Sequence, residues 1–194
     1  MTTFVLATAN PHKTEEMRAV LEPLGVDLLD RPLDMADVEE SGDTLEENAL
    51  WKARALVVAT GCAAIADDTG LFVDALDGRP GVRSARYAGE SASYDENVTK
   101  LLEELRAIGA PRTARFVTVI AVAYPDGSAF SVEGELRGVI THARAGDQGF
   151  GYDPVFMPDD AGGRTLAQLT PREKNDVSHR GRALRALVEE LARR

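Results

Sequence analysis

The chain has 194 residues, of which 44% are hydrophobic and 28% charged, and its formal net charge is −10 at pH 7. This composition is typical of a globular protein and excludes a disordered one, and the negative charge argues against a broad nucleic-acid-binding face, because phosphate backbones require a basic surface. The length suits residues 1–194 as a single domain, built as two lobes or as one large sheet with helices.

Cysteine usage and hydropathy predict a cytoplasmic protein without a membrane partner. Cys62 is the only cysteine, so no intrachain disulfide can form, which is typical of a reducing compartment. No basic region precedes the first apolar run, and no segment is long enough to span a membrane. We therefore expect a cytoplasmic location.

The first strand–loop–helix unit has the features of a phosphate-binding site. Residues 4–7 (FVLA) predict a short buried strand, and Asn10 and Pro11 suit the cap and the first position of a helix. Free N–H groups at the helix start, together with the charge of Lys13, suit an anion. The alternative is a solvated lysine on an ordinary cap, but a first-turn lysine opposes the helix dipole. The glycines of a Walker loop are missing.

A second strand is expected over residues 26–29. An acidic run follows, usually a solvated loop, and consists of Asp34, Asp37, Glu39 and Glu40. The capping box Thr44–Glu47 predicts a helix from Leu45 to about Thr60. Asn48 and Lys52 share a stripe beside the apolar face of that helix. Such a stripe could line a cleft, although exposure to solvent is its more common role.

The most informative stretch begins with the apolar residues 63–66, which predict a strand ending at two adjacent carboxylates, Asp67 and Asp68. Thr69 and Gly70 then predict a turn before a second apolar run. Adjacent carboxylates repel, so the pair indicates either a metal or acid–base site or an Asx turn that binds nearby backbone N–H groups. This stretch alone does not decide between them.

The second half continues the α/β pattern. The capping box Ser93–Glu96 predicts a helix with a clear core stripe. Residues 116–124 predict an apolar strand, and the turn at 125–127 leads into a second strand over 129–136, which together make a hairpin. A strand around residues 139–140 continues it.

Two C-terminal features suit a flat, anionic ligand. Gly149 and Gly151 frame Phe150, whose ring could stack on a base, although buried aromatics in a glycine-rich loop are the alternative. A capping box at residues 170–173 begins a short helix containing Lys174, and a serine caps the last helix at residue 178. The first turn of that helix holds cationic residues 179 and 180, which oppose its dipole and indicate a nearby anion or carbonyl oxygen.

Together these residues suit a metal–polyphosphate site with a flat base. The acidic candidates for Mg²⁺ are Glu39, Asp67 and Asp68. The candidates for neutralising phosphate oxygens are Lys13, Lys52, Lys174 and Arg180. No Cys/His cluster indicates zinc, and no serine or cysteine has an evident triad.

Five blocks in order resemble the XTP/dITP diphosphatases, also called inosine triphosphate pyrophosphatases. They are LATANPHK (6–13), EESGDTLEENALWKA (39–53), IADDTGLFVDALDGRPGVRSARYAG (65–89), GFGYDPVF (149–156) and SHRGRAL (178–184), the last preceded by Lys174. The resemblance implies an α/β fold in which a long mixed β-sheet and flanking helices form two lobes around a central active-site cleft. It also implies a homodimer and Mg²⁺-dependent hydrolysis of ITP, dITP and XTP to the monophosphate and pyrophosphate, which cleanses the nucleotide pool.

The resemblance assigns roles residue by residue. Asp68 would be the catalytic proton acceptor and, with Glu39, a metal ligand. The triphosphate would bind Thr8, Ala9, Asn10, Pro11, His12 and Lys13, and Thr69 would touch the substrate. Base and sugar would meet Phe150, Gly151, Tyr152, Asp153, Lys174, His179 and Arg180. Ala9 and Thr69 stand where the family usually has glycine and serine.

Two other functions remain open. A nucleotide-binding regulatory module would keep the base pocket and would not need Asp68. A phosphatase that releases single phosphates also uses paired acids and Mg²⁺, although the Asp-x-Asp pattern of the haloacid dehalogenases is absent at Asp67-Asp68. The released product, phosphate or pyrophosphate, distinguishes these functions.

Overall fold

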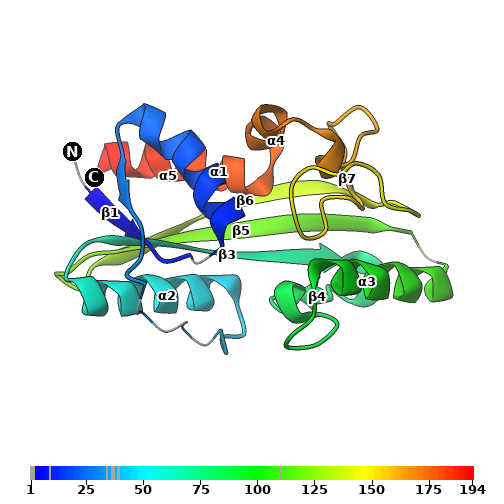
Figure 1. The fold of residues 1–194 in the computed structure, drawn as a ribbon, viewed down its shortest axis with the longest axis horizontal. Helices are drawn as coiled ribbons and strands as arrows, with labels where there is room; N and C mark the ends of the chain where they lie inside the picture. The colour runs from blue at the N-terminus through cyan, green and yellow to red at the C-terminus, as the bar shows by residue number, and fades with distance from the viewer. Residues whose placement is uncertain (1–2, 9, 34, 36–37, 39, 110) are drawn as a thin grey trace. The chain divides into compact units, whose positions relative to one another are not determined.

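The computed structural model describes residues 3–8, 10–33, 35, 38, 40–109 and 111–194. Their strands form a mixed sheet in the order β2-β1-β3-β5-β6-β7, with β4 paired to β3 (Figure 1). The strands are β1 (Thr3–Leu6), β2 (Asp27–Leu29), β3 (Ala64–Val73), β4 (Pro80–Gly81), β5 (Thr113–Ala123), β6 (Ala129–Ile140) and β7 (Phe156–Pro158). The helices are α1 (Pro11–Leu21), α2 (Leu45–Thr60), α3 (Tyr94–Ile108), α4 (Pro171–Val177) and α5 (His179–Arg193). The predicted mixed sheet with flanking helices is confirmed.

The chain folds into two compact units, each assembled from separate stretches of sequence. Unit 1 contains Met1–Asp68, Thr118–Gly134 and Arg180–Arg194, and unit 2 contains Thr69–Val117 and Glu135–His179. Strands β3, β5 and β6 contribute residues to both units. The active-site cleft expected between two lobes stays a prediction.

Unit 1 packs helices on both faces of its part of the sheet. Helices α1 and α5 cover one face and α2 covers the other (Figure 1). Alternation along β1 explains this arrangement, because successive strand residues point to opposite faces. Phe4 and Leu6 pack with Met17 of α1, whereas Val5 packs with Leu56 of α2. On each face of the sheet, the first turn of a helix, α1 or α2, lies close to the middle of β3.

Unit 2 has its own apolar core around α3. Val98, Leu101 and Leu105 lie on one stripe of the helix and pack against residues such as Leu71 and Phe156. This confirms the predicted core stripe except at its last member, Ile108, which is 49% exposed at the end of the helix. None of the helices that the structure describes is long and apolar enough to cross a membrane.

Local helix and turn predictions agree closely with the structure. Capping boxes begin α2, α3 and α4 at Thr44, Ser93 and Thr170. The Asn10 side chain caps α1 by accepting a hydrogen bond from the His12 backbone N–H at 3.0 Å. Strands β5 and β6 are sheet neighbours joined by five residues, and β6 continues to residue 140, as predicted.

The turn predicted in the central stretch is wrong. Strand β3 runs without interruption from Ala64 to Val73, so Asp67 and Asp68 lie in mid-strand and the Asx turn does not form. Consecutive strand residues face opposite sides, which separates the two carboxylates and removes the expected repulsion. Gly70 is explained by close packing, because a Cβ there would lie 2.7 Å from the carbonyl oxygen of Gly81 in β4.

Candidate active site

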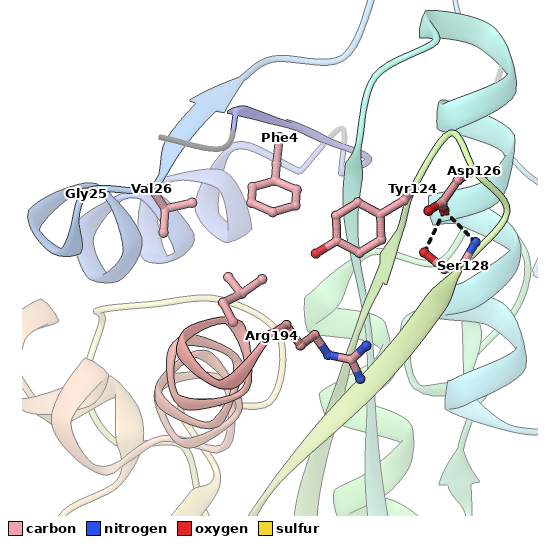
Figure 2. Close-up of a pocket in the computed structure, with 8 residues that line it drawn as sticks. Phe4, Gly25, Val26, Tyr124, Asp126, Ser128 and Arg194 are labelled. Atoms are coloured by element: carbon pink, nitrogen blue, oxygen red, sulfur yellow. Dashed lines mark hydrogen bonds between the residues drawn. The ribbon is translucent and has the colours of Figure 1, made fainter.

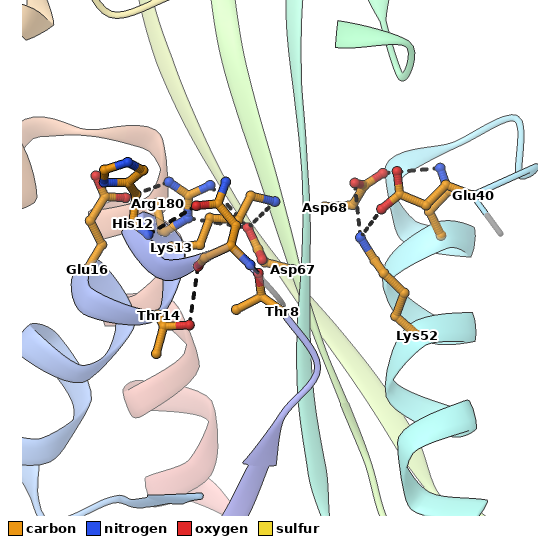
Figure 3. A network of polar contacts seen from close by, with 12 residues as sticks. Thr8, His12, Lys13, Thr14, Glu16, Glu40, Lys52, Asp67, Asp68 and Arg180 are labelled. Atoms are coloured by element: carbon orange, nitrogen blue, oxygen red, sulfur yellow. Dashed lines mark hydrogen bonds and ion pairs between the residues drawn. The ribbon is translucent and has the colours of Figure 1, made fainter. Parts of the chain in front are cut away.

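Asp67 and Asp68 project from opposite faces of β3 toward two different sets of charged contacts (Figure 3). Both are nearly inaccessible to solvent, at 3% and 5% exposure. A buried carboxylate requires cationic or hydrogen-bonding partners, and the helices of unit 1 supply them.

Asp67 joins α1 to α5. Its Oδ2 lies 3.1 Å from Lys13 Nζ and 3.1 Å from Arg180 Nη2. Arg180 Nη1 contacts Glu16 Oε2 at 2.6 Å, so the guanidinium bridges a strand carboxylate and a helix carboxylate. Arg180 is only 2% exposed. Its predicted contact with the base of a nucleotide stays a prediction.

The unfavourable placement of cations in two helix first turns now has a physical reason. Lys13 in α1 and Arg180 in α5 both oppose their helix dipoles, and the anion beside them is Asp67. Burial alone would raise the pKa of Asp67, but the charges of Lys13, Arg180 and Lys52 outweigh burial and hold that pKa well below its usual value. Asp67 is therefore a permanent negative charge at neutral pH.

Asp68 is held by one face of α2. Its Oδ1 lies 3.2 Å from Lys52 Nζ, and its Oδ2 accepts a hydrogen bond from Asn48 Nδ2 at 3.1 Å. Lys52 Nζ also contacts Glu40 Oε1 at 2.6 Å. The polar stripe of α2 therefore faces a carboxylate, and its more common role in solvent is wrong for this helix.

The environments of the two aspartates push their pKa values apart. Burial raises the pKa of Asp68, the charge of Lys52 opposes this rise, and the charge of Glu40 adds to it, with a net raised value. Neighbouring acids whose pKa values are moved in opposite directions are candidates for different acid–base roles. The role of Asp68 as proton acceptor stays a prediction, whereas Asp67 is the countercharge of Lys13 and Arg180.

The donor chemistry around Asp68 suits Mg²⁺. Carboxylates of Asp68 and Glu40 converge on one cation, the Lys52 ammonium. Magnesium uses oxygen ligands and commonly binds one or two carboxylates together with substrate phosphates. In the part of the chain that the structure describes, no group of three or more Asp, Glu, His or Cys side chains forms a metal site by itself.

Glu40 was missed as a site residue by sequence reasoning, which placed it only in an acidic run. The predicted metal ligand Glu39 and the predicted phosphate contact Ala9 lie outside the described residues. Glu40 is half-buried and contacts Lys52. The only hint in the sequence was its position in the block that also contains Lys52.

The predicted phosphate loop leads from β1 into α1. The Asn10 backbone N–H donates to Thr8 Oγ1 at 3.1 Å, and Asn10 Oδ1 accepts from the His12 N–H. Pro11 is the first residue of α1, and His12 is exposed. Of these residues, the structure brings Lys13 to the buried Asp67; their phosphate contacts stay predictions.

Unit 2 brings the glycine-framed aromatic and Lys174 into one cluster. Lys174 Nζ contacts Asp153 Oδ2 at 2.6 Å and lies 4.6 Å from the centroid of the Phe150 ring. The same Asp153 oxygen accepts a hydrogen bond from the Phe150 N–H at 2.8 Å. Gly149 has φ 74°, and a Cβ there would overlap the Asp153 carboxylate, so only glycine fits.

The remaining predicted substrate contacts are Tyr152, His179, Thr69 and Gly151, of which the first two are buried. The Tyr152 hydroxyl is buried and donates to the Ser84 carbonyl oxygen at 2.9 Å. The buried His179 ring stacks on Phe116 with centroids 4.5 Å apart. Thr69 is half-buried in β3, and Gly151 is half-buried in the loop before β7. Their roles with base and sugar stay predictions.

A pocket of about 460 Å³ also lies in unit 1 (Figure 2). Its lining is partly apolar and is formed by Phe4, Gly25, Val26, Tyr124, Asp126, Ser128, Leu191 and Arg194. None of the predicted site residues lines it. The candidate chemistry is therefore assigned to the charged networks on β3.

Comparison with known proteins adds independent observations. The model of the Ham1 family matches residues 4–190. A dITP/XTP pyrophosphatase of Geobacter sulfurreducens is 50% identical over 98% of this chain and 97% of that protein, and one of Thermus thermophilus is 51% identical over 95% and 89%. A solved HAM1 protein structure from Coxiella burnetii is 40% identical, covers 100% of both chains and has a TM-score of 0.91.

Proposed function

Since this chain belongs to the Ham1 family, we propose that it hydrolyses dITP, ITP and XTP to the nucleoside monophosphate and pyrophosphate. The observation that carries the proposal is 50% identity, over almost the whole chain, to a protein named dITP/XTP pyrophosphatase. The buried Asp68, with its raised pKa and its lysine partner, supports hydrolysis over simple binding. By removing non-standard purine nucleotides, this reaction would cleanse the nucleotide pool.

Asp68 is the residue that would take the proton in this reaction. Hydrolysis breaks the bond between the α- and β-phosphates. The water oxygen bonds to one of these two phosphorus atoms, and the bridging oxygen leaves with the other phosphorus atom. Asp68 accepts the proton of the attacking water, and the raised pKa of its carboxylate favours that transfer. Lys52 and Lys13 would neutralise phosphate oxygens as negative charge shifts between them.

Mg²⁺ would be held by Asp68 and Glu40, together with Glu39 as the resemblance implies. When bound, the ion would neutralise phosphate charge and orient the phosphates and the water. The network on the other face of β3 would keep Lys13 in place, because Asp67 binds its ammonium directly. The homodimer and the cytoplasmic location stay predictions.

Metal removal tests the cofactor. We expect EDTA to lower the rate of pyrophosphate release at least about tenfold, and excess Mg²⁺ to restore it. The physical reason is repulsion: a triphosphate would approach Asp68 and Glu40 in a chain whose net charge is −10. Full activity in a thoroughly metal-stripped sample would contradict the requirement.

Base selectivity tests the substrate class. Purine position six carries an oxygen, a hydrogen-bond acceptor, in inosine and xanthosine but an amino group, a donor, in adenine. As the resemblance implies, the start of α5 would offer the base donors from backbone N–H groups and from the side chains of His179 and Arg180. We expect kcat/KM for ITP to exceed that for ATP by up to about a thousandfold, since two unmade buried hydrogen bonds cost about 1–3 kcal/mol each. GTP should lie between them.

A screen of nucleoside triphosphates with Mg²⁺ tests the function as a whole. The expected result is pyrophosphate release from dITP, ITP and XTP well above that from ATP, GTP and the pyrimidine nucleotides. Tight binding of these nucleotides without turnover would favour a regulatory module. Comparable ITP and ATP kinetics would contradict the proposed substrate class.

A further inference from the structure

The first turn of α2 contains a buried amide that links two parts of the candidate site. Asn48 is 1% exposed. Its Oδ1 accepts a hydrogen bond from the Gly42 backbone N–H at 2.9 Å, and its Nδ2 donates to Asp68 Oδ2 at 3.1 Å. The orientation of the amide is determined chemically, because the Gly42 N–H can only donate and an ionised carboxylate can only accept.

The same local structure recurs at the start of α3, where it serves only the backbone. Asn97 also directly follows the last residue of a capping box and is also 1% exposed. Its Oδ1 accepts from the Ala88 N–H at 2.7 Å, and its Nδ2 donates to the Ala85 carbonyl oxygen at 2.9 Å. In both helices the asparagine anchors the loop that precedes the helix. Only Asn48 directs its N–H to an ionisable side chain.

This difference has a consequence for the Asp68 carboxylate. Asn48 binds Oδ2, and Lys52, one helical turn later, binds Oδ1. Two donors on the same helix face, each taking a different oxygen, fix the plane of the carboxylate. The other end of the Asn48 amide holds the segment at Gly42, two residues after Glu40.

We propose that Asn48 is a positioning residue that holds the Asp68 carboxylate in register with the Glu40–Gly42 segment, a role that rests on the proposed hydrolytic function of Asp68. Gly42 belongs to the same hydrogen-bonded arrangement, because its N–H donates to the Asn48 side chain. A Cβ at Gly42 would lie 2.7 Å from Asn48 Oδ1, which is too close to be accommodated without displacing the amide.

The kinetic test compares Asn48→Asp with Asn97→Asp. Each variant keeps the acceptor for the loop N–H and replaces the donating NH₂ with oxygen. Asn48→Asp should lower kcat for dITP about 10–100-fold, with KM changed less than about threefold, because groups that orient a catalytic carboxylate have effects of this size. Asn97→Asp should leave kcat within about twofold of wild type. Its fall in Tm should be comparable to that of Asn48→Asp.

Gly42→Ala provides a second, independent route. It leaves Asn48 and Asp68 chemically intact and crowds the amide most closely, with the Glu47 Cβ next at 3.0 Å. We therefore expect kcat to fall about tenfold or more. If Asn48→Asp does not fold, this variant keeps the proposal testable. Wild-type kcat in folded Asn48→Asp or in Gly42→Ala would overturn the positioning role.

Metal-free protein supplies a readout that does not depend on turnover. In NMR spectra, the Asn48 side-chain NH₂ signals should shift in Asp68→Ala, and the Gly42 amide should exchange with solvent at least about tenfold faster in Asn48→Leu than in wild type. Unchanged NH₂ signals and unchanged exchange would overturn the link itself. If the wild-type protein released no pyrophosphate from any nucleotide, both the proposed function and the positioning role of Asn48 in catalysis would be wrong. If the wild-type protein is active and Asn48→Asp is equally active, only the positioning role of Asn48 is wrong.

Discussion

Asp68→Asn is expected to remain folded and to lose at least about a hundredfold in kcat for dITP. The substitution preserves shape but removes the group that accepts a proton and that would bind Mg²⁺. The fold should tolerate it, because Asp68 is buried in a setting that already disfavours its charged form. Initial rates of pyrophosphate release, with Tm measured on the same preparation, separate lost chemistry from lost structure.

The matched comparison for this variant is the wild-type protein at equal folded fraction. A rate within about threefold of wild type would exclude Asp68 as the proton acceptor. A large fall in Tm would instead show that the bonds to Asn48 and Lys52 serve mainly the fold.

Asp67→Asn is expected to have its largest effect on stability. It removes the carboxylate between Lys13 and Arg180, and the guanidinium of Arg180 is only 2% exposed. Removing one partner of a buried ion pair typically costs about 3–5 kcal/mol, because the remaining charge stays desolvated. Urea unfolding at pH 7 should therefore show a decrease of about that size in the free energy of unfolding. Glu16 still contacts Arg180, so the lower end of the range is expected.

The pH dependence of this stability difference follows from the lowered pKa of Asp67. A carboxyl group whose folded-state pKa lies below its unfolded value stabilises the fold above the unfolded pKa of about 3.9, and that contribution is lost as pH falls toward the folded value. The difference between wild type and Asp67→Asn should thus be constant above about pH 5 and shrink below pH 4. A difference under about 1 kcal/mol at pH 7 would contradict the role of Asp67 as a structural countercharge.

Local features of the fold could be predicted because they depend on neighbours in sequence. The capping boxes at Thr44, Ser93 and Thr170 fix helix starts through bonds made within four residues. The course of β3 could not be read in this way. Asp67-Asp68 and Gly70 resemble a turn locally, yet Gly70 is required by the approach of β4, which only the folded sheet reveals.

The candidate site shows the same limit. From the local penalty of a first-turn cation, sequence reasoning inferred an anionic ligand beside Lys13 and an anion or a carbonyl oxygen beside Arg180, and the structure places a protein carboxylate beside both. Sequence reasoning could not identify that carboxylate as Asp67, which is 113 residues from Arg180 along the chain. It also placed Asn48 and Lys52 on one stripe of a helix, but it could not show that this stripe faces β3. Long-range pairing of this kind depends on strand order and on which helix covers which face.

The most direct measurement of the proposed reaction is ³¹P NMR of dITP incubated with the wild-type protein and Mg²⁺. The expected products are dIMP and pyrophosphate in equal amounts, with neither orthophosphate nor dIDP accumulating. The Asp68→Asn protein at the same concentration should leave dITP essentially intact over the same period. Formation of dIDP with orthophosphate, or unchanged dITP with the wild-type protein, would contradict the assignment of this chain as a nucleoside-triphosphate pyrophosphatase.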